Sequence, residues 1–151
     1  MEIVRMTADH VPQGAALEAI CFRDPWSERS VASELDNPLS LWLVALDGER
    51  VAGYIGSQTV LGESDMMNVA VHPDYRKQGI ATGLITELIG ALKKRESHCL
   101  TLEVRASNEP AKNLYQMLDF EEIGIRKNYY RNPREDALIL RKEWQNEYSG
   151  N

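Results

Sequence analysis

A strand-like segment, a tight turn and a long helix follow one another between residues 68 and 95. Asn68–Val71 is extended and largely apolar, Gly79 lies in the turn, and Ala81 keeps the start of the helix free of a bulky side chain. The first N–H groups of a helix have no partner within it, and the helix dipole attracts negative charge to them. Small residues let an anion approach these groups closely. The turn therefore predicts a phosphate or pyrophosphate site, although a tight turn that needs only one glycine has the same pattern.

The spacing of the small residues excludes two common nucleotide-binding loops. The dinucleotide pattern G-x-G-x-x-G is absent, because Gly79, Ala81 and Gly83 fall at the wrong spacing. The P-loop pattern G-x-x-x-x-G-K-[ST] is also absent. Neither a Rossmann dinucleotide site nor a P-loop NTPase is expected.

A carboxylate and a phenol further along the chain could carry proton transfers. Glu103 lies in the strand-like run 100–104, and because side chains alternate along a strand, Thr101 and Glu103 share one face. A carboxylate can act as a general base through one water molecule, and a phenol can act as a general acid. The alternatives remain open: Glu103 could simply face solvent, and Tyr115, three residues before Leu118 on a short helix, could be a core aromatic.

Two aromatic pairs, Pro25-Trp26 and Tyr129-Tyr130, fall in turn-rich stretches between predicted elements. Exposed aromatic side chains in such stretches are typical of binding surfaces. We therefore expect Tyr129 and Tyr130 to lie outside the core. For Trp26, a binding role and simple anchoring of its loop on the sheet are equal alternatives.

The elements that must position these residues alternate between strands and helices. Strands are predicted over residues 2–6, 39–46, 51–59, 64–71, 100–104, 120–126 and 137–141. Helices are predicted from Asp9 to about Phe22, from the N-cap Ser27 to a point before Pro38, over residues 79–95, and from Asn108 to Leu118. This order indicates one α/β (α+β) domain, residues 1–151, with a central, mostly antiparallel mixed sheet of about seven strands flanked by four helices.

Composition and charge limit the classes of partner. The chain has 151 residues, of which 43% are hydrophobic and 26% charged, and its formal net charge is −6. An acidic surface repels phosphate backbones, so we expect no nucleic-acid partner. The same charge suits a cationic partner such as an amine or a basic peptide.

The remaining residue counts give expectations about cysteines, metals and membranes. Cys21 and Cys99 both lie next to apolar residues and are expected to be buried, reduced thiols. The three histidines are scattered, so no metal site is expected. The N-terminus lacks the apolar segment of a secretion signal, and no apolar run approaches the roughly 20 residues of a membrane span. We expect a cytoplasmic protein without a membrane partner.

The segment Arg76–Ala81, read R-K-Q-G-I-A, resembles the R/Q-x-x-G-x-G/A motif of the GNAT superfamily of acyl-CoA-dependent N-acyltransferases. Ala81 stands where glycine is commonest, and alanine is a frequent variant. The resemblance implies acetyl-CoA as co-substrate, with loop amides on its pyrophosphate and amides of the preceding strand on its pantetheine arm and thioester oxygen. The cofactor-binding residues implied are Val69, Ala70, Val71, Arg76, Lys77, Gln78, Gly79, Ile80, Ala81, Thr82 and Asn108.

A narrower resemblance covers most of the chain. The blocks 102–108 (L-E-V-R-A-S-N), 111–120 and 126–130 (R-K-N-Y-Y), together with 25–27 and 135–137, are similar to the RimI-type ribosomal-protein alanine N-acetyltransferases. The usual glycine before Phe120 is Asp119 here, in a helix-to-strand turn. This resemblance implies Glu103 as general base, Tyr115 as general acid, and Trp26, Tyr129 and Tyr130 beside the entering peptide. Asn108 would contact the cofactor and could cap its helix as well.

The implied substrate is the N-terminal alanine of a small-subunit ribosomal protein, acetylated by direct transfer by a monomer or weak dimer. An α-amino group has a pKa of about 8, so roughly a tenth is neutral at pH 7, whereas a lysine at about 10.4 is almost fully charged. An α-amine therefore needs little help from a base. Acetylation of lysines or small amines, and a non-catalytic acyl-CoA-binding module, remain alternatives.

Overall fold

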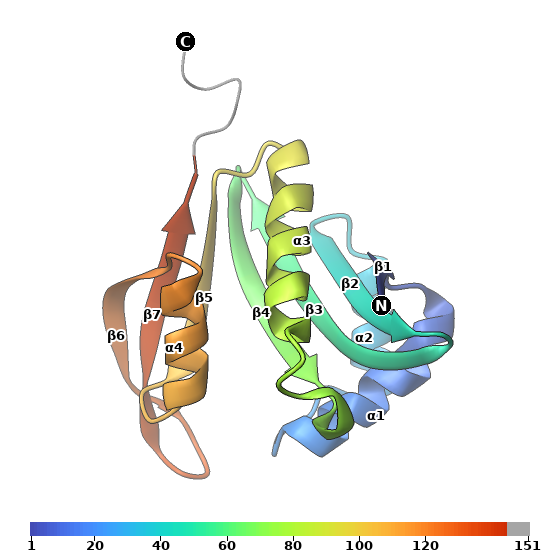
Figure 1. Cartoon of the computed structure of the whole chain (residues 1–151). Helices are drawn as coiled ribbons and strands as arrows, with labels where there is room; N and C mark the ends of the chain where they lie inside the picture. Colours follow the sequence, from blue (N-terminus) through green and yellow to red (C-terminus); the bar gives the residue numbers. More distant parts are fainter. Residues whose placement is uncertain (145–151) are drawn as a thin grey trace.

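The computed structural model describes residues 1–144, which form a seven-stranded sheet flanked by four α-helices (Figure 1). The strands are β1 (Glu2–Arg5), β2 (Ser40–Asp47), β3 (Arg50–Val60), β4 (Glu63–Val71), β5 (Cys99–Arg105), β6 (Glu121–Tyr130) and β7 (Glu135–Glu143). The helices are α1 (Val11–Cys21), α2 (Glu28–Leu35), α3 (Ile80–Lys94) and α4 (Glu109–Met117), with 3₁₀ turns η1 (Ala8–His10) and η2 (Pro73–Tyr75). The predicted fold class is confirmed.

The sheet changes from antiparallel to parallel pairing in its middle. Its strand order is β1-β2-β3-β4-β5-β7-β6, and β4–β5 is its parallel pair. That pair contains only three residue pairs, from Glu63 opposite Cys99 to Asp65 opposite Thr101. Beyond Asp65, β4 remains paired with β3 on one side only, and a register shift at Gly56/Ser57 marks a bulge. The two central strands therefore form a wedge that is closed at one end and open at the other.

Two apolar cores cover the two faces of the sheet. Side chains alternate along β2, so Leu41 and Leu43 pack in the cluster with α3, while Trp42 and Val44 pack in the cluster with α1 and α2. The apolar stripe of α3 is fully buried, as its helical spacing predicts. Figure 1 shows α3 and α4 together on one face, with α1 and α2 behind the sheet. The wedge is thus held between two packed layers.

Several boundaries differ from those expected. The first helix begins at Val11 instead of following Asp9, because residues 8–10 form a 3₁₀ turn capped by Thr7. The predicted N-cap Ser27 is confirmed, since its hydroxyl accepts from the Ser30 N–H at 3.1 Å. β6 continues to Tyr130, four residues beyond its predicted end.

The expectation that both cysteines are buried holds for Cys99 and is wrong for Cys21. Cys99 has no exposed surface. Cys21 is half-buried at the end of α1, because the chain turns away there and leaves its thiol beside the open end of the wedge. Within residues 1–144, no helix is long and apolar enough to cross a membrane.

Candidate active site

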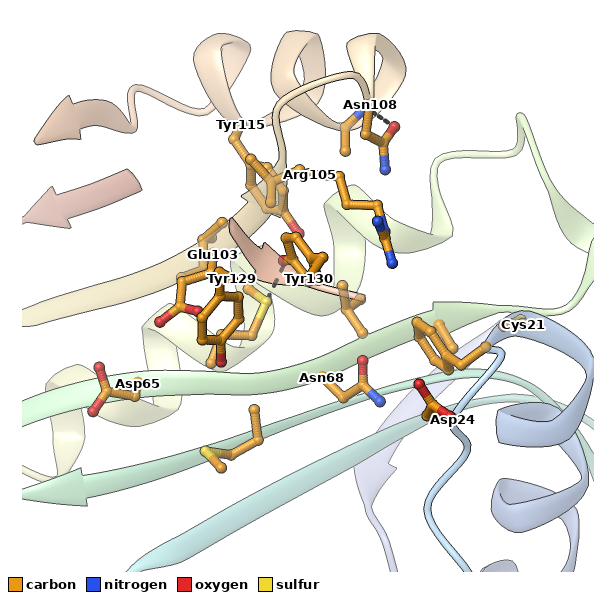
Figure 2. A pocket seen from close by; sticks show the side chains of 18 of the residues that line it. Cys21, Asp24, Asp65, Asn68, Glu103, Arg105, Asn108, Tyr115, Tyr129 and Tyr130 are labelled. Atoms are coloured by element: carbon orange, nitrogen blue, oxygen red, sulfur yellow. Dashed lines mark hydrogen bonds between the residues drawn. The ribbon is translucent and has the colours of Figure 1, made fainter. Parts of the chain in front are cut away.

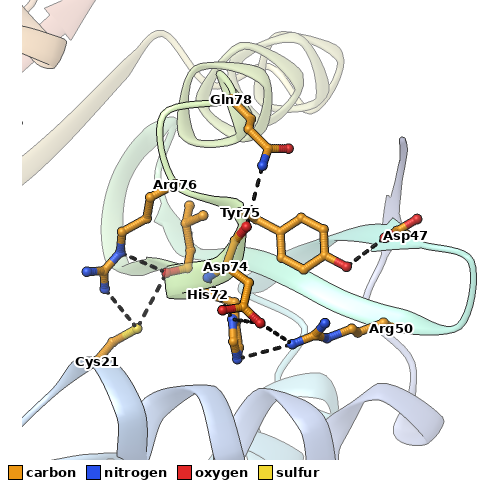
Figure 3. Close-up of polar contacts among 9 residues, drawn as sticks. Cys21, Asp47, Arg50, His72, Asp74, Tyr75, Arg76 and Gln78 are labelled. Atoms are coloured by element: carbon orange, nitrogen blue, oxygen red, sulfur yellow. Dashed lines mark hydrogen bonds and ion pairs between the residues drawn. The ribbon is translucent and has the colours of Figure 1, made fainter.

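The turn before α3 is held by polar contacts with the β2–β3 hairpin (Figure 3). The His72 Nδ1 atom accepts a hydrogen bond from the Asp74 N–H at 3.1 Å, and the Arg50 guanidinium donates to the Asp74 carboxylate at 3.0 Å. The Tyr75 hydroxyl donates to Asp47 at 2.6 Å. These contacts fix where the chain enters α3.

The loop that follows leaves backbone amides free for an anion. Lys77 and Gly79 both adopt left-handed conformations, with φ of 63° and 78°. A Cβ built on Gly79 would meet no other atom within 4 Å, so the space in front of the helix is open. The first N–H groups of α3, from Ile80 to Thr82, have no partner within the helix. This arrangement fits a pyrophosphate, and a side chain at Gly79 would enter the space it needs.

Two side chains of the predicted cofactor loop brace the loop itself. The Arg76 guanidinium donates to the Val71 carbonyl oxygen at 3.4 Å and approaches the Cys21 sulfur at 3.8 Å. The Gln78 amide donates to the Asp74 carbonyl oxygen at 3.4 Å. In this structure these side chains shape the turn, and the groups left free to meet an anion are those of the backbone.

The open edge of β4 supplies a second set of backbone groups. Donors and acceptors alternate between the two sides of a strand. The His72 N–H bonds to Ala52 on β3, whereas the Val71 carbonyl faces the wedge, where Arg76 reaches it. By this alternation Val69 and Val71 turn their amides into the wedge, and Ala70 turns its own toward β3. Ala70 still lines the cleft with its side chain.

Glu103 extends from β5 toward the wedge, on the same face as Thr101, as its strand position predicts. Its side chain is 29% exposed and pairs with the Arg126 guanidinium at 2.9 Å. The Tyr129 hydroxyl also lies against Glu103, and this hydrogen bond is the main reason why the pKa of Tyr129 is raised. Glu103 is therefore a held, partly shielded carboxylate that still reaches the cleft.

Tyr115 is a core aromatic whose hydroxyl also lies at the cleft. Its side chain is buried and its ring packs edge-on against Phe120, with 5.4 Å between ring centroids. Its hydroxyl reaches the cleft and donates to the Met66 sulfur at 3.7 Å. Burial raises the pKa of this phenol far above its usual value. The hydroxyl therefore carries its proton at neutral pH.

Asn108 caps α4, because its side-chain oxygen accepts from the Ala111 N–H at 3.2 Å. It also lines the cleft, and its amide nitrogen makes no hydrogen bond within residues 1–144 (Figure 2). The capping expectation is confirmed, and the nitrogen remains available for a ligand.

The aromatic residues Trp26, Tyr129 and Tyr130 line the cleft, from positions that differ in part from expectation. Tyr129 and Tyr130 lie within β6, so their placement between elements is wrong; β6 continues to Tyr130 because that residue pairs with Glu135 on β7. Tyr129 is 48% exposed, and burial and the charge of Glu103 raise the pKa of Tyr130 to about 12.

Trp26 packs on Trp42 with ring centroids 5.6 Å apart, so it anchors its loop and also lines the cleft.

Sequence reasoning missed Glu18, which holds the Trp26 loop against β4. The side chain is buried on α1, accepts from the Trp26 N–H at 2.9 Å, and accepts from the Asn68 amide at 2.6 Å. Desolvation raises the pKa of its carboxyl group despite these two hydrogen bonds. Its only signal in the sequence is an acidic residue beside Leu17 on an otherwise apolar helix face, which does not reveal what it binds.

These groups surround one cleft of about 1090 Å³ along the open wedge. Figure 2 shows Glu103, Tyr115, Tyr129 and Tyr130 gathered on one side, with Asp65 and Asn68 along β4 and Cys21 and Asp24 at the end of α1. Of the predicted site residues, those lining the cleft are Trp26, Val69, Ala70, Val71, Ala81, Glu103, Asn108, Tyr115, Tyr129 and Tyr130. Arg76, Lys77, Gln78, Gly79, Ile80 and Thr82 do not line it and form the adjoining turn and helix start.

Comparison with known proteins gives a family. The Acetyltransferase (GNAT) family matches residues 12–120. The chain belongs to the GNAT acetyltransferase family. The expectation drawn from the Arg76–Ala81 motif is thereby confirmed, and this GNAT protein is an acyltransferase. GNAT proteins use acetyl-CoA, and the anion-binding turn of this chain has the features that such a ligand requires.

Individual relatives agree with the narrower resemblance. The chain is 39% identical over 132 residues to the [ribosomal protein bS18]-alanine N-acetyltransferase of Escherichia coli K12, covering 86% of this chain and 88% of that protein. The crystal structure of the ribosomal-protein-S18-alanine N-acetyltransferase from Escherichia coli has a TM-score of 0.86 at 37% identity, covering 94% and 92% of the two chains. The resemblance to RimI-type enzymes is thus confirmed.

A more distant structure shows the same fold. An aminoglycoside 6'-N-acetyltransferase complexed with coenzyme A has a TM-score of 0.83 at 16% identity, covering 95% of this GNAT chain and 97% of the other. At that identity the likeness concerns the fold alone.

Proposed function

We propose that this protein transfers an acetyl group from acetyl-CoA to the N-terminal α-amine of a protein, with the N-terminal alanine of ribosomal protein bS18 as its natural acceptor. The observation that carries the proposal is the single cleft that contains a carboxylate, Glu103, and a protonated phenol, Tyr115, beside the unpaired edge of β4. The relatives named for this reaction support it.

The chain holds the acetyl donor mainly with backbone groups. The amides from Lys77 to Thr82 bind the pyrophosphate, and the amides of Val69 and Val71 bind the pantetheine arm and the thioester oxygen. Acetyl-CoA supplies the acetyl group as a thioester. The free side-chain nitrogen of Asn108 adds a donor on the opposite wall. The fixed amides stabilise negative charge as it develops on the thioester oxygen.

Glu103 acts as the general base. A carboxylate can remove a proton from an α-amine through one water, and the fraction of α-amine that is already neutral makes this a small task at pH 7. Arg126 and Tyr129 hold the Glu103 side chain toward the cleft. Tyr115 acts at the other end of the reaction and donates its phenolic proton to the departing thiolate.

The acceptor side favours a basic peptide. Asp24, Asp65 and Glu103 all line the cleft. Asp65 makes no ion pair among residues 1–144, and burial together with the charges of Glu103 and Glu63 raises the pKa of its carboxyl group. A cationic side chain close behind the acceptor's N-terminus would relieve this repulsion. Trp26, Tyr129 and Tyr130 line the peptide's path.

Direct transfer is part of the proposal, and Cys21 is its specific rival. The thiol lies at the cleft and donates to the Val71 carbonyl at 3.7 Å, so burial gives no argument against an acetyl-cysteine intermediate there. Retained activity in Cys21→Ser, with no acetylated cysteine detected by mass spectrometry, is the expected result for direct transfer.

The proposal extends to the organisation of the chain. Residues 1–151 act as one acetyltransferase domain, in the cytoplasm, as a monomer or weak dimer. The alternatives with the same fold are acetylation of lysine side chains or small amines, and acyl-CoA binding without catalysis.

Steady-state CoA release with two short peptides separates these functions. One peptide begins Ala-Arg with a free α-amine, and the other has the same sequence with a blocked N-terminus and an internal lysine. We expect turnover of the first peptide only. Turnover of the second only would establish lysine acetylation instead. Binding of acetyl-CoA without turnover of either peptide would contradict the proposed acceptor.

A further inference from the structure

Three potential metal ligands meet at the closed end of the wedge. A carboxylate oxygen of Glu63, a ring nitrogen of His98 and the sulfur of Cys99 all lie within 4.8 Å of one another. None of the three lines the acetyl-transfer cleft. Along the strand, Glu63 is six residues from Val69, which corresponds to about 20 Å. Glu63 lies two residues before Asp65, which lines the cleft, so the cluster adjoins one end of the cleft without forming part of its lining.

The backbone around the cluster is well fixed. Glu63 and Cys99 are the first residues of β4 and β5 and lie opposite each other in the parallel register. The His98 N–H donates to the Gly62 carbonyl at 2.9 Å, and the His98 carbonyl accepts from the Trp144 N–H at 3.1 Å. The three ligand atoms therefore come from segments that hydrogen bonds already hold together, so little ordering is needed to bind an ion.

The donor set suits a borderline-soft divalent ion. Thiolate, imidazole and carboxylate are the usual ligands of Zn²⁺, and neighbouring ligand atoms around a tetrahedral Zn²⁺ lie about 3 to 4 Å apart. Binding of an ion would draw the three atoms, which lie within 4.8 Å of one another, closer to that spacing. Glu63 and His98 are exposed and Cys99 is buried, so an ion can enter from the solvent side and leave its fourth position to water.

The surrounding charges are compatible with a dication. Arg141 donates to Glu63 at 3.3 Å but makes a shorter ion pair, 2.9 Å, with Glu143. When Glu63 turns to the ion, Arg141 keeps Glu143 as its partner. With the Cys99 thiol ionised, Glu63, Cys99 and Glu143 are negative and Arg141 is positive. Zn²⁺ neutralises the resulting net charge of −2.

We propose that Glu63, His98 and Cys99 form a site for Zn²⁺ or a similar divalent transition-metal ion, which links β4 to β5 at the closed end of the wedge. The pair is joined there by a register of only three residues, from Glu63 to Asp65. A bound ion adds a link across this short junction and stabilises the closed end of the wedge.

Cobalt substitution tests the site directly. Purified full-length protein, stripped with a chelator and kept reduced, is titrated with Co²⁺ while its absorption spectrum is recorded. We expect saturation at one equivalent, visible bands of four-coordinate cobalt and a near-ultraviolet thiolate-to-cobalt band. Cys99→Ser should lose the thiolate band, and His98→Ala should weaken binding at least tenfold. Cys21→Ser, which removes the other thiol, should keep the wild-type spectrum.

A thermal measurement keeps the test independent of the spectrum. Excess Zn²⁺ should raise the melting temperature of the wild type by a few degrees and leave that of His98→Ala unchanged. Because His98 is exposed, this variant is expected to fold even if Cys99→Ser does not. The inference is overturned if no thiolate band forms, if the band follows Cys21, or if the Zn²⁺ shift persists in His98→Ala. These readouts do not depend on acetyl transfer.

Discussion

The two halves of the cleft are built in different ways. The side assigned to the cofactor in the proposed function is a turn and a helix start, contiguous in the chain, and it offers backbone N–H groups from Lys77 to Thr82. The other side is made of side chains from α1, β4, β5 and β6 that are far apart in the chain, which include Cys21, Asp65, Glu103 and Tyr129. The first half needs the right backbone conformation, whereas the second needs a correctly assembled tertiary structure.

The two halves also differ in charge. The start of α3 presents the positive end of a helix dipole, and the acceptor side presents carboxylates. Under the proposed function, one half binds the anionic pyrophosphate and the other binds the amine-bearing peptide. If this separation is real, substitutions on the two sides should affect different constants: acetyl-CoA affinity on one side, and turnover or acceptor KM on the other.

The largest effect is expected on the acceptor side, from Glu103→Gln. Loss of a general base lowers kcat by about 10²–10⁴-fold, and because roughly a tenth of an α-amine is already neutral at pH 7, we expect a loss near the lower end, about 10²-fold. The dissociation constant for acetyl-CoA should change little, because the loop amides are untouched. Steady-state assays measure kcat, and calorimetric titration measures the dissociation constant for acetyl-CoA. A near-wild-type kcat would remove Glu103 from the mechanism.

The corresponding change on the cofactor side is Gly79→Val. Its Cβ enters the open space before α3, and valine is strained at a φ of 78°, so acetyl-CoA binding should weaken by about 100-fold or more. Gly90→Val is the matched control, since a Cβ at Gly90 also meets nothing within 4 Å but lies away from the turn. Urea unfolding of both variants separates strain from lost binding. Unchanged acetyl-CoA titration would contradict the anion site.

Tyr115→Phe should have a smaller effect on turnover than Glu103→Gln. The thiolate of a thiol with a pKa of about 8.5 is a reasonable leaving group even without a proton from Tyr115. The kcat should therefore fall by only about 10- to 100-fold. The buried ring and its contact with Phe120 are retained, so the fold and the acetyl-CoA affinity should be preserved. An unchanged kcat with every acceptor would mean that Tyr115 is only a core aromatic.

Asp65→Asn tests the acidic character of the acceptor side. An exposed charge contributes about 0.2–1 kcal/mol, so kcat/KM for an Ala-Arg peptide should fall by about 1.4- to 5-fold, mainly through KM. An Ala-Gln peptide should show no such change. Asp36→Asn, which removes an exposed charge at the end of α2, controls for net charge. Equal losses for both peptides would contradict charge recognition.

The smallest effect concerns the pH dependence of stability through Glu18. Desolvation raises the pKa of this carboxyl group in the folded state, so the native protein binds its proton more tightly than the unfolded chain does. The Glu18 carboxyl group therefore contributes most to the free energy of unfolding when the pH is below its pKa in the unfolded chain. This contribution is lost as the pH rises through its pKa in the folded protein. Urea unfolding from pH 4 to 7 should show Glu18→Gln gaining stability relative to wild type as the pH rises. The opposite trend would mean that the two hydrogen bonds outweigh desolvation.

The site was predictable to the extent that it depends on local backbone. Gly79 and the start of α3 could be recognised because a positive φ, a free helix end and small neighbours are properties of a few consecutive residues. The placement of Tyr129 and Tyr130 could not be predicted from the sequence, because β6 continues to Tyr130 only where β7 offers a partner at Glu135. Glu18 was missed because its two partners, Trp26 and Asn68, are 8 and 50 residues away.

Periodicity and local conformation suffice to predict the order of strands and helices, the glycine turn before α3 and the face of β5 that carries Glu103. Three features follow only from the folded arrangement: β4 and β5 part after three residue pairs, Cys21 lies at the cleft, and Glu63 meets His98 and Cys99. The reason is physical: local preferences act over a few residues, whereas contacts between distant segments form only when the two cores on either side of the sheet pack and fix the register of its strands.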